Sequence, residues 1–186
     1  MEDIISEMIN QETAYEVFDR LEGVSIEFMI GKWKGYELHT GHAMEGLLSI
    51  VPWFGKMFVS SEEVIPLLFE DKRGRTYAIN PRRLFKLSDV PVLFVPVKLY
   101  AKLVMKGKIS CNSHMFDWAY KFLNSKKTDA RLRQIVYRKK LSAAMIYDEL
   151  GIIDVFRKVD ENTVVGLMDF KGKWGKQGYF FYLKRC

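Results

Sequence analysis

The chain contains few of the residues on which secreted and metal-dependent proteins rely. Among its 186 residues are two cysteines, Cys111 and Cys186, and three histidines. Two isolated cysteines favour free thiols in a reducing compartment over a structural disulfide. The motifs CxxC, HExxH and GxSxG and the phosphate-binding loop are missing, which argues against the protein classes that depend on them.

A candidate membrane span is missing as well. A helical span needs about 20 mostly apolar residues, and the longest apolar run, residues 90–105, is interrupted by Pro91, Pro96, Lys98 and Lys102. The N-terminus shows a charged amphipathic pattern in place of a secretory signal. We therefore expect a cytoplasmic protein.

Aromatic side chains and positive charge are plentiful. The chain holds 13 Phe, 9 Tyr and 4 Trp, residues that favour strands and line apolar cavities. Its net charge of +6 is uneven, because residues 1–89 carry 10 basic against 15 acidic residues and residues 90–186 carry 19 against 8. The basic half is either a solvated surface or one that attracts phosphate-bearing partners such as anionic lipid or nucleic acid.

The second half predicts a meander of strands. Apolar and aromatic segments alternate there with short turn-like separators, and a meander without covering helices tends to close on itself. With three or four strands from the first half, this predicts a mainly β fold of the α+β type, an antiparallel barrel of about 8–9 strands that can hold one small ligand. The five expected strands are Ala130–Lys139, Leu141–Asp148, Ile152–Val159, Thr163–Phe170 and Tyr179–Arg185.

The first half is predicted to supply the remaining strands. Ser25–Leu38 has the pattern of a strand broken by glycines, and residues 51–59 form an aromatic-rich extended segment. Leu67–Glu70 and Arg75–Asn80 flank a turn at Gly74 and predict a hairpin.

Two helical regions are expected around this barrel. Residues 3–22 carry apolar side chains at helical spacing, and Gly23 ends the pattern. Residues 90–126 contain helix-compatible stretches, which we interpret as an insertion that covers one end of the barrel. The chain then divides into residues 1–89, this insertion and residues 127–186, all contributing to one barrel.

An ordered series of short motifs points to a family. Residues 31–35 read Gly-Lys-Trp-Lys-Gly, and residues 40–42 (Thr-Gly-His) and 53–56 (Trp-Phe-Gly-Lys) follow. This series resembles the GxWxG family. The second half, with Met-Ile-Tyr-Asp at residues 145–148 and Gly-Leu-Met-Asp at residues 166–169, is similar to the uncharacterised domain that usually follows it. The resemblance implies a lipocalin-like β-barrel that binds lipid, including phospholipid.

No cofactor and no metal are expected. Lipocalin-like haem proteins that also begin with GxWxG, a more distant resemblance, place a haem-ligating histidine late in the chain. This sequence has no histidine after His114. His39 and His42 could bring two metal ligands together, but no third ligand is evident.

Gly31, Trp33, Gly35 and Arg185 form the expected structural motif. The glycines let the first strand bend and a neighbouring strand approach, while the indole of Trp33 plugs the narrow end of the barrel. A basic residue commonly stacks on this ring in lipocalin-like folds. Arg185 is the candidate, because closure places the last strand beside the first.

His42 and Glu45 are the best candidates for chemistry. If their segment is helical, the three-residue spacing puts both side chains on one face. An imidazole oriented by a carboxylate can act as a base, a metal ligand or a phosphate contact, but the same pair can anchor a loop. Because no nucleophile stands near in a recognisable motif, no catalytic residue is assigned.

Alternation along the meander marks further candidates. Arg131, Arg133 and Tyr137 share one face of a strand. On the next strand, Tyr147 shares one face with apolar neighbours. If that face is internal, the guanidinium groups suit a carboxylate or phosphate head group; if it is external, they are solvated charges. The pattern leaves both directions open. The predicted ligand-binding set is His42, Arg131, Arg133, Tyr137, Tyr147, Trp53 and Phe181.

Acidic residues near strand ends have a simpler interpretation. Asp148, Asp154 and Asp169 could serve acid–base chemistry in pairs. Aspartates at strand ends, however, more often accept hydrogen bonds from turns.

The sequence therefore predicts a non-catalytic binder of a lipid or another amphipathic ligand. One alternative is an enzyme acting on a small hydrophobic substrate through His42 and nearby carboxylates. Another is a basic nucleic-acid-binding module, although no such signature is present. The apolar segment Val92–Met105, with Lys98, Lys102, Lys106 and Lys108, also suggests a peripheral contact with an anionic membrane. The oligomeric state stays open.

Overall fold

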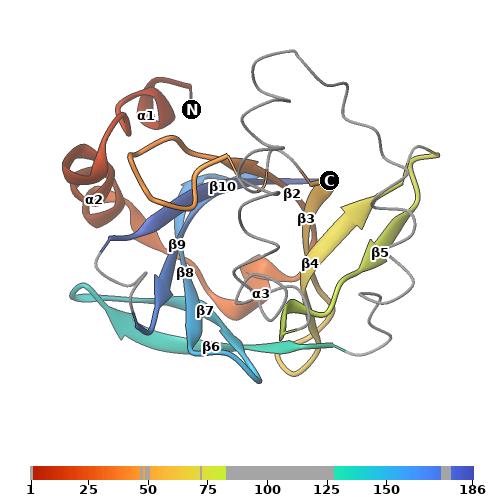
Figure 1. Ribbon diagram of the computed structural model, residues 1–186. Helices are drawn as coiled ribbons and strands as arrows, with labels where there is room; N and C mark the ends of the chain where they lie inside the picture. The colour runs from red at the N-terminus through yellow and green to blue at the C-terminus, as the bar shows by residue number, and fades with distance from the viewer. Residues whose placement is uncertain (1, 47, 49–50, 72, 83–127, 173–176) are drawn as a thin grey trace, which may run out of the picture.

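Ten strands and three short helices are defined within the described residues (Figure 1). The computed structural model describes residues 2–46, 48, 51–71, 73–82, 128–172 and 177–186. The helices are α1 (Glu2–Ser6), α2 (Gln11–Arg20) and α3 (Ile26–Met29). The strands are β1 (Glu22–Gly23), β2 (Gly31–Glu37), β3 (Trp53–Phe58), β4 (Val64–Glu70), β5 (Thr76–Ala78), β6 (Ala130–Tyr137), β7 (Lys140–Tyr147), β8 (Ile152–Asp160), β9 (Thr163–Phe170) and β10 (Tyr179–Arg185).

Eight of these strands close into an antiparallel barrel. The order around it is β2, β3, β4, β6, β7, β8, β9 and β10, and β10 pairs back onto β2. The two extra strands lie outside this ring, since β1 pairs with β8 and β5 pairs with β4. The predicted barrel of about 8–9 strands is confirmed, because closure leaves the long meander without an unpaired edge.

The strands of the second half agree with prediction to within two residues at each end. Their alternation of inward and outward residues made them visible in the sequence. The turn between β6 and β7 lies at Arg138 and Lys139, both of which have positive φ angles of 47° and 67°. Two central residues with positive φ are typical of the tight hairpin turn whose twist matches that of the strands.

Two expectations for the first half were wrong in detail. The helix predicted over residues 3–22 is two helices, because Asn10 ends the first segment and caps α2. Its side chain accepts a hydrogen bond from the Thr13 amide at 3.0 Å, and Thr13 reaches back to the Asn10 amide. The strand predicted over Ser25–Leu38 begins only at Gly31, since Ser25 caps the one-turn helix α3.

Two apolar layers lie on opposite faces of the same sheet. One fills the barrel, and the other packs α2 against the outer face of the strands β7 to β10 through Val17, Phe18, Val155, Leu167 and Phe180. Figure 1 looks into the ring of strands, with α1 and α2 beside it and α3 within it. On each of these strands, one set of alternate side chains therefore packs against α2, and the other set lines the barrel interior.

The two halves of the chain meet along two unequal seams. Between β2 and β10 the register runs over five residue pairs, from Phe181 opposite Glu37 to Arg185 opposite Trp33. Between β4 and β6 it consists of one pair, Val64 opposite Ala130. The barrel is thus joined firmly on one side and narrowly on the other.

The predicted insertion over residues 90–126, and with it the suggested membrane contact, lies outside the described residues. In the described part of the chain, no helix has the length and apolar character needed to cross a membrane.

Candidate functional site in the barrel interior

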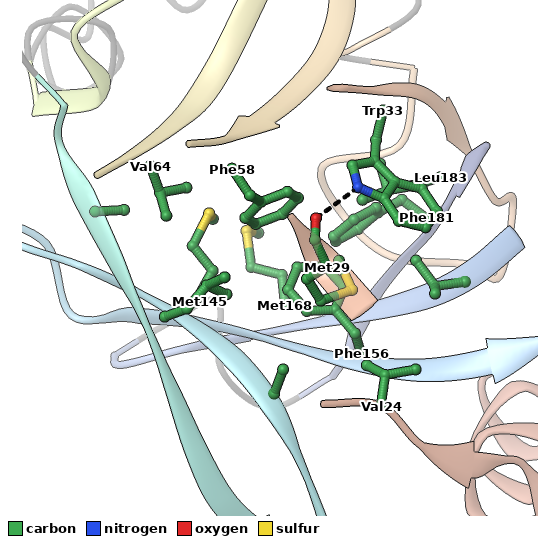
Figure 2. Close-up of a cluster of buried hydrophobic side chains, with 14 of the residues drawn as sticks. Val24, Met29, Trp33, Phe58, Val64, Met145, Phe156, Met168, Phe181 and Leu183 are labelled. Atoms are coloured by element: carbon green, nitrogen blue, oxygen red, sulfur yellow. Dashed lines mark hydrogen bonds between the residues drawn. The ribbon is translucent and has the colours of Figure 1, made fainter. Parts of the chain in front are cut away.

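The barrel interior is lined by apolar and aromatic side chains from opposite strands. Figure 2 shows Phe58, Met145, Phe156, Met168 and Phe181 pointing toward one another across it. The ring centres of Phe58 and Phe156 are 5.6 Å apart, and those of Phe156 and Phe181 are 6.4 Å apart, in edge-to-face geometry. Such contacts bring rings together at favourable angles.

One end of the barrel is closed around Trp33. This side chain is fully buried, and its indole N–H donates to the Met29 carbonyl of α3 at 2.7 Å. The Arg185 guanidinium lies 4.2 Å from the centre of the Trp33 ring and donates to the Phe28 and Ile30 carbonyls. Helix α3, Trp33 and Arg185 together form a plug whose polar groups are satisfied.

Gly35 on β2 makes room for a second tryptophan in the barrel wall. A Cβ atom at Gly35 would lie 2.2 Å from the ring of Trp53, so only glycine lets that indole pack against the strand. The motif thus holds one tryptophan in the plug and admits a second one to the wall.

The interior also contains a buried ion pair, Lys56 with Asp154. The Lys56 ammonium lies 2.8 Å from Oδ2 of Asp154 and donates to the Pro66 carbonyl at 3.2 Å. Lys56 is 3% exposed and Asp154 is 0% exposed. The rings of Phe181 and Tyr147 lie 5.0 and 5.9 Å from the ammonium nitrogen. A charged pair is therefore held among aromatic rings.

Two buried polar atoms near this pair have no hydrogen-bond partner among the described residues. They are Oδ1 of Asp154 and the indole nitrogen of Trp53, whereas Oδ2 of Asp154 has its ion-pair contact with Lys56. Trp53 and Lys56 have a common neighbour in Phe181, whose ring centre is 6.3 Å from that of Trp53. Burial raises the pKa of the Asp154 carboxyl, and the Lys56 ammonium opposes that shift. An unpartnered acceptor and an unpartnered donor thus lie in one apolar compartment, where each costs stability.

Sequence patterning did not identify this pair. Lys56 was noted only as part of a motif, and Asp154 was assigned to turns. The register of β3 shifts on both sides of Gly55, which has a φ of 151°. This bulge turns both Trp53 and Lys56 inward, although an odd spacing would separate them on a regular strand. A lysine directly after a glycine in an aromatic strand is the signal that could have found it.

A small pocket lies beside Tyr147. It measures about 10 Å³, room for about one water molecule. Its lining residues include Asn80, Asp129, Tyr147, Glu149 and Leu150. Tyr147 also belongs to the interior cluster, and burial raises the pKa of its phenol well above the ordinary value. This tyrosine therefore lies between the pocket and the ion pair.

The predicted site residues separate into two groups. Trp53, Tyr147 and Phe181 face the interior together. Arg131 and Arg133 lie on the outer face of β6, because Ala130 and Leu132 take the inward positions. Arg131 is paired with Asp148, and Arg133 with Glu62 at 2.9 Å. The external alternative thus holds for both arginines, so they do not reach an occupant of the barrel.

Tyr137 also lies outside the barrel. It packs against the layer under α2, and its pKa is raised to about 12, first by burial and then by the Asp169 carboxylate. It belongs to the contact between the barrel and the N-terminal helices.

His42 and Glu45 are close together, but their contacts are those of a loop anchor. Glu45 accepts hydrogen bonds from the backbone amides of Gly41 and His42. The Nδ1 atom of His42 accepts from the Met44 amide at 3.1 Å, which places the imidazole proton on Nε2. The His42 ring packs edge-on against Tyr179, 5.4 Å between centres.

Tyr179 ties this loop to the barrel. Its hydroxyl donates to Glu37 at 2.6 Å, and the same Glu37 oxygen accepts from the Gly46 amide. Burial, and then Glu37, raise the pKa of Tyr179. Across the described ranges, no group of three or more acidic, histidine or cysteine side chains is arranged to hold a metal ion.

Fold and interior together define a closed antiparallel β-barrel, plugged at one end, with an ion pair buried among aromatic side chains. Residues 16–74 match the family described as GXWXG protein, and residues 128–185 match the domain of unknown function DUF4334. The two matches follow in the expected order, consistent with the GXWXG family and the domain that follows it.

A solved structure has the same fold. It is the crystal structure of a protein from Thermomonospora curvata, 29% identical in sequence, with a TM-score of 0.66. The similarity covers 100% of this chain and 95% of that chain. No curated protein matches the sequence.

Proposed function

We propose that the barrel binds a slender amphipathic ligand, a lipid or similar molecule with one alkyl chain, in its interior. The observation that carries this proposal is a pair of polar atoms, on Asp154 and Trp53, that are buried among apolar rings and have no hydrogen-bond partner in the described part of the chain. Ligand sites have this composition: apolar walls with a few convergent polar groups.

The interior side chains suit an occupant that enters by displacing them. The pocket beside Tyr147 is far smaller than the roughly 300 Å³ of a typical ligand site. Met145 and Met168 line the interior, and methionine is the apolar side chain that adapts most readily to a new neighbour. One alkyl chain requires less displacement than the two chains of a phospholipid, so a single-chain ligand is favoured.

Native mass spectrometry of the purified protein, followed by denaturing extraction and lipid analysis, tests the proposal. We expect a retained amphiphile, or binding of added single-chain amphiphiles measured by calorimetry. The interior variant Ala143→Met should weaken binding about tenfold or more by overfilling the barrel. Val136→Met on the exposed face of β6 is the matched control.

A protein free of any retained molecule that also fails to bind added amphiphiles would contradict the proposal. If Ala143→Met does not fold, Trp53→Phe provides a second measurement. It should remove most of the change in tryptophan fluorescence on binding while calorimetry still detects the ligand.

A further inference from the structure

The charge of Lys56 is already compensated inside the barrel. Its ammonium lies 2.8 Å from Oδ2 of Asp154 and donates to the Pro66 carbonyl at 3.2 Å. Breaking a buried ion pair leaves an uncompensated charge at large cost. Lys56 is therefore not available to an anionic head group without the loss of its carboxylate partner.

An acidic ligand would also meet a like charge. A fatty-acid carboxylate or a phosphate beside Lys56 would lie next to the buried carboxylate of Asp154, and two buried carboxylates disfavour each other's ionisation. The arginines best suited to such head groups, Arg131 and Arg133, are paired with acids on the outer face.

The two polar groups that lack partners among the described residues suit a different kind of ligand head group. Oδ1 of Asp154 needs a donor when ionised, and the indole N–H of Trp53 needs an acceptor. A hydroxyl both donates and accepts and carries no charge. It can satisfy Asp154 in either protonation state, which neither a carboxylate nor an ammonium does.

We propose that the barrel selects a neutral single-chain amphiphile with a hydroxyl head, a long-chain alcohol or monoester, over a fatty acid or phospholipid. This inference rests on the proposed function and adds the class of head group. The hydroxyl donates to Oδ1 of Asp154, while the alkyl chain lies among Phe156, Met168 and Phe181.

Dodecanol and dodecanoic acid, equal in chain length, form the test. Calorimetric titration of the unaltered protein at neutral pH should show the alcohol binding at least about tenfold more tightly than the acid. Asp154→Asn removes the buried carboxylate and leaves the Lys56 ammonium unpaired, so this variant should bind the acid in preference to the alcohol. Asp148→Asn, which changes an exposed aspartate, is the matched control and should keep the original preference.

If Asp154→Asn does not fold, the neutral pair Lys56→Met with Asp154→Asn replaces it and should lose the preference for the alcohol. Equal or tighter binding of the acid to the unaltered protein would overturn this inference and leave the proposed function standing. Failure of both ligands to bind a protein that also retains no amphiphile would overturn both.

Discussion

At the scale of single residues, burial decides the behaviour of the ionisable side chains. Asp154, Tyr137 and Tyr179 all have pKa values raised chiefly by removal from water. The carboxyl of Asp71, in the turn before β5, has a lowered pKa because backbone amides and the Arg75 side chain donate to it. The polar chemistry of this protein therefore belongs to buried positions, where a change of proton or partner has a measurable cost.

Tyr137 should titrate with a pKa of about 12, well above the ordinary tyrosine value of 10.0. An ultraviolet absorbance titration of the unaltered protein minus that of Tyr137→Phe isolates its midpoint. Because the folded-state pKa exceeds the unfolded one, the contribution of Tyr137 to stability is complete below pH 10 and declines as the pH rises toward 12. Tyr137→Phe should remove this decline in urea unfolding.

Asp169→Asn serves as the companion variant for Tyr137. It removes the second cause of the shift but not burial, so the midpoint should move down without reaching 10.0. A midpoint at 10.0 in the unaltered protein would show that Tyr137 is not buried under α2.

At the scale of elements, the caps of the N-terminal helices carry the clearest expectation. Asn10→Ala removes the reciprocal capping bonds with Thr13 and should reduce the free energy of unfolding by about 1 kcal/mol. Asn162→Ala, at an exposed turn, should change it by less than about 0.5 kcal/mol. Equal losses in urea titrations of the two variants would count against a stabilising cap.

The same elements show how far sequence patterning reaches. The strands β6 to β10 were predictable because their side chains alternate and short turns separate them. The sequence did not predict which face of each strand points inward, so it left Arg131 and Arg133 on either the inner or the outer face. The inward position of Leu132 places both arginines on the outer face. The interior ion pair depends on the bulge at Gly55, and a one-residue change of register moves a side chain to the opposite face.

The interior residues also differ in how well the sequence predicted them. Trp53, Tyr147 and Phe181 are large aromatic side chains, which favour burial in any register. Asp154 faces inward only because Phe156 and Ile152 do so on the same strand. The buried Asp154 is paired with Lys56 from a strand far away in the sequence. Such a tertiary contact cannot be predicted from the local sequence pattern.

At the scale of the whole molecule, the unequal seams should make one side of the barrel open first. The amides of Asp129 and Leu132 bond to Val64 and Ser61 across the narrow seam, and those of Tyr182 and Lys184 face β2, because bonding alternates along β10. The first two should exchange with solvent at least about tenfold faster than the second two. Hydrogen–deuterium exchange read by mass spectrometry or NMR tests this. Equal protection on both sides would mean that the barrel opens only by global unfolding.

The pairing of β2 with β10 affects how the protein folds during synthesis. Strand β2 ends at Glu37, and its partner β10, which begins at Tyr179, is synthesised much later. At about 5–20 residues per second, β2 waits on the order of 10 to 30 s with an open edge, and such edges template aggregation. The yield of folded protein in a cell should therefore depend on how well the nascent chain is shielded during this interval, more than on the stability of the finished barrel.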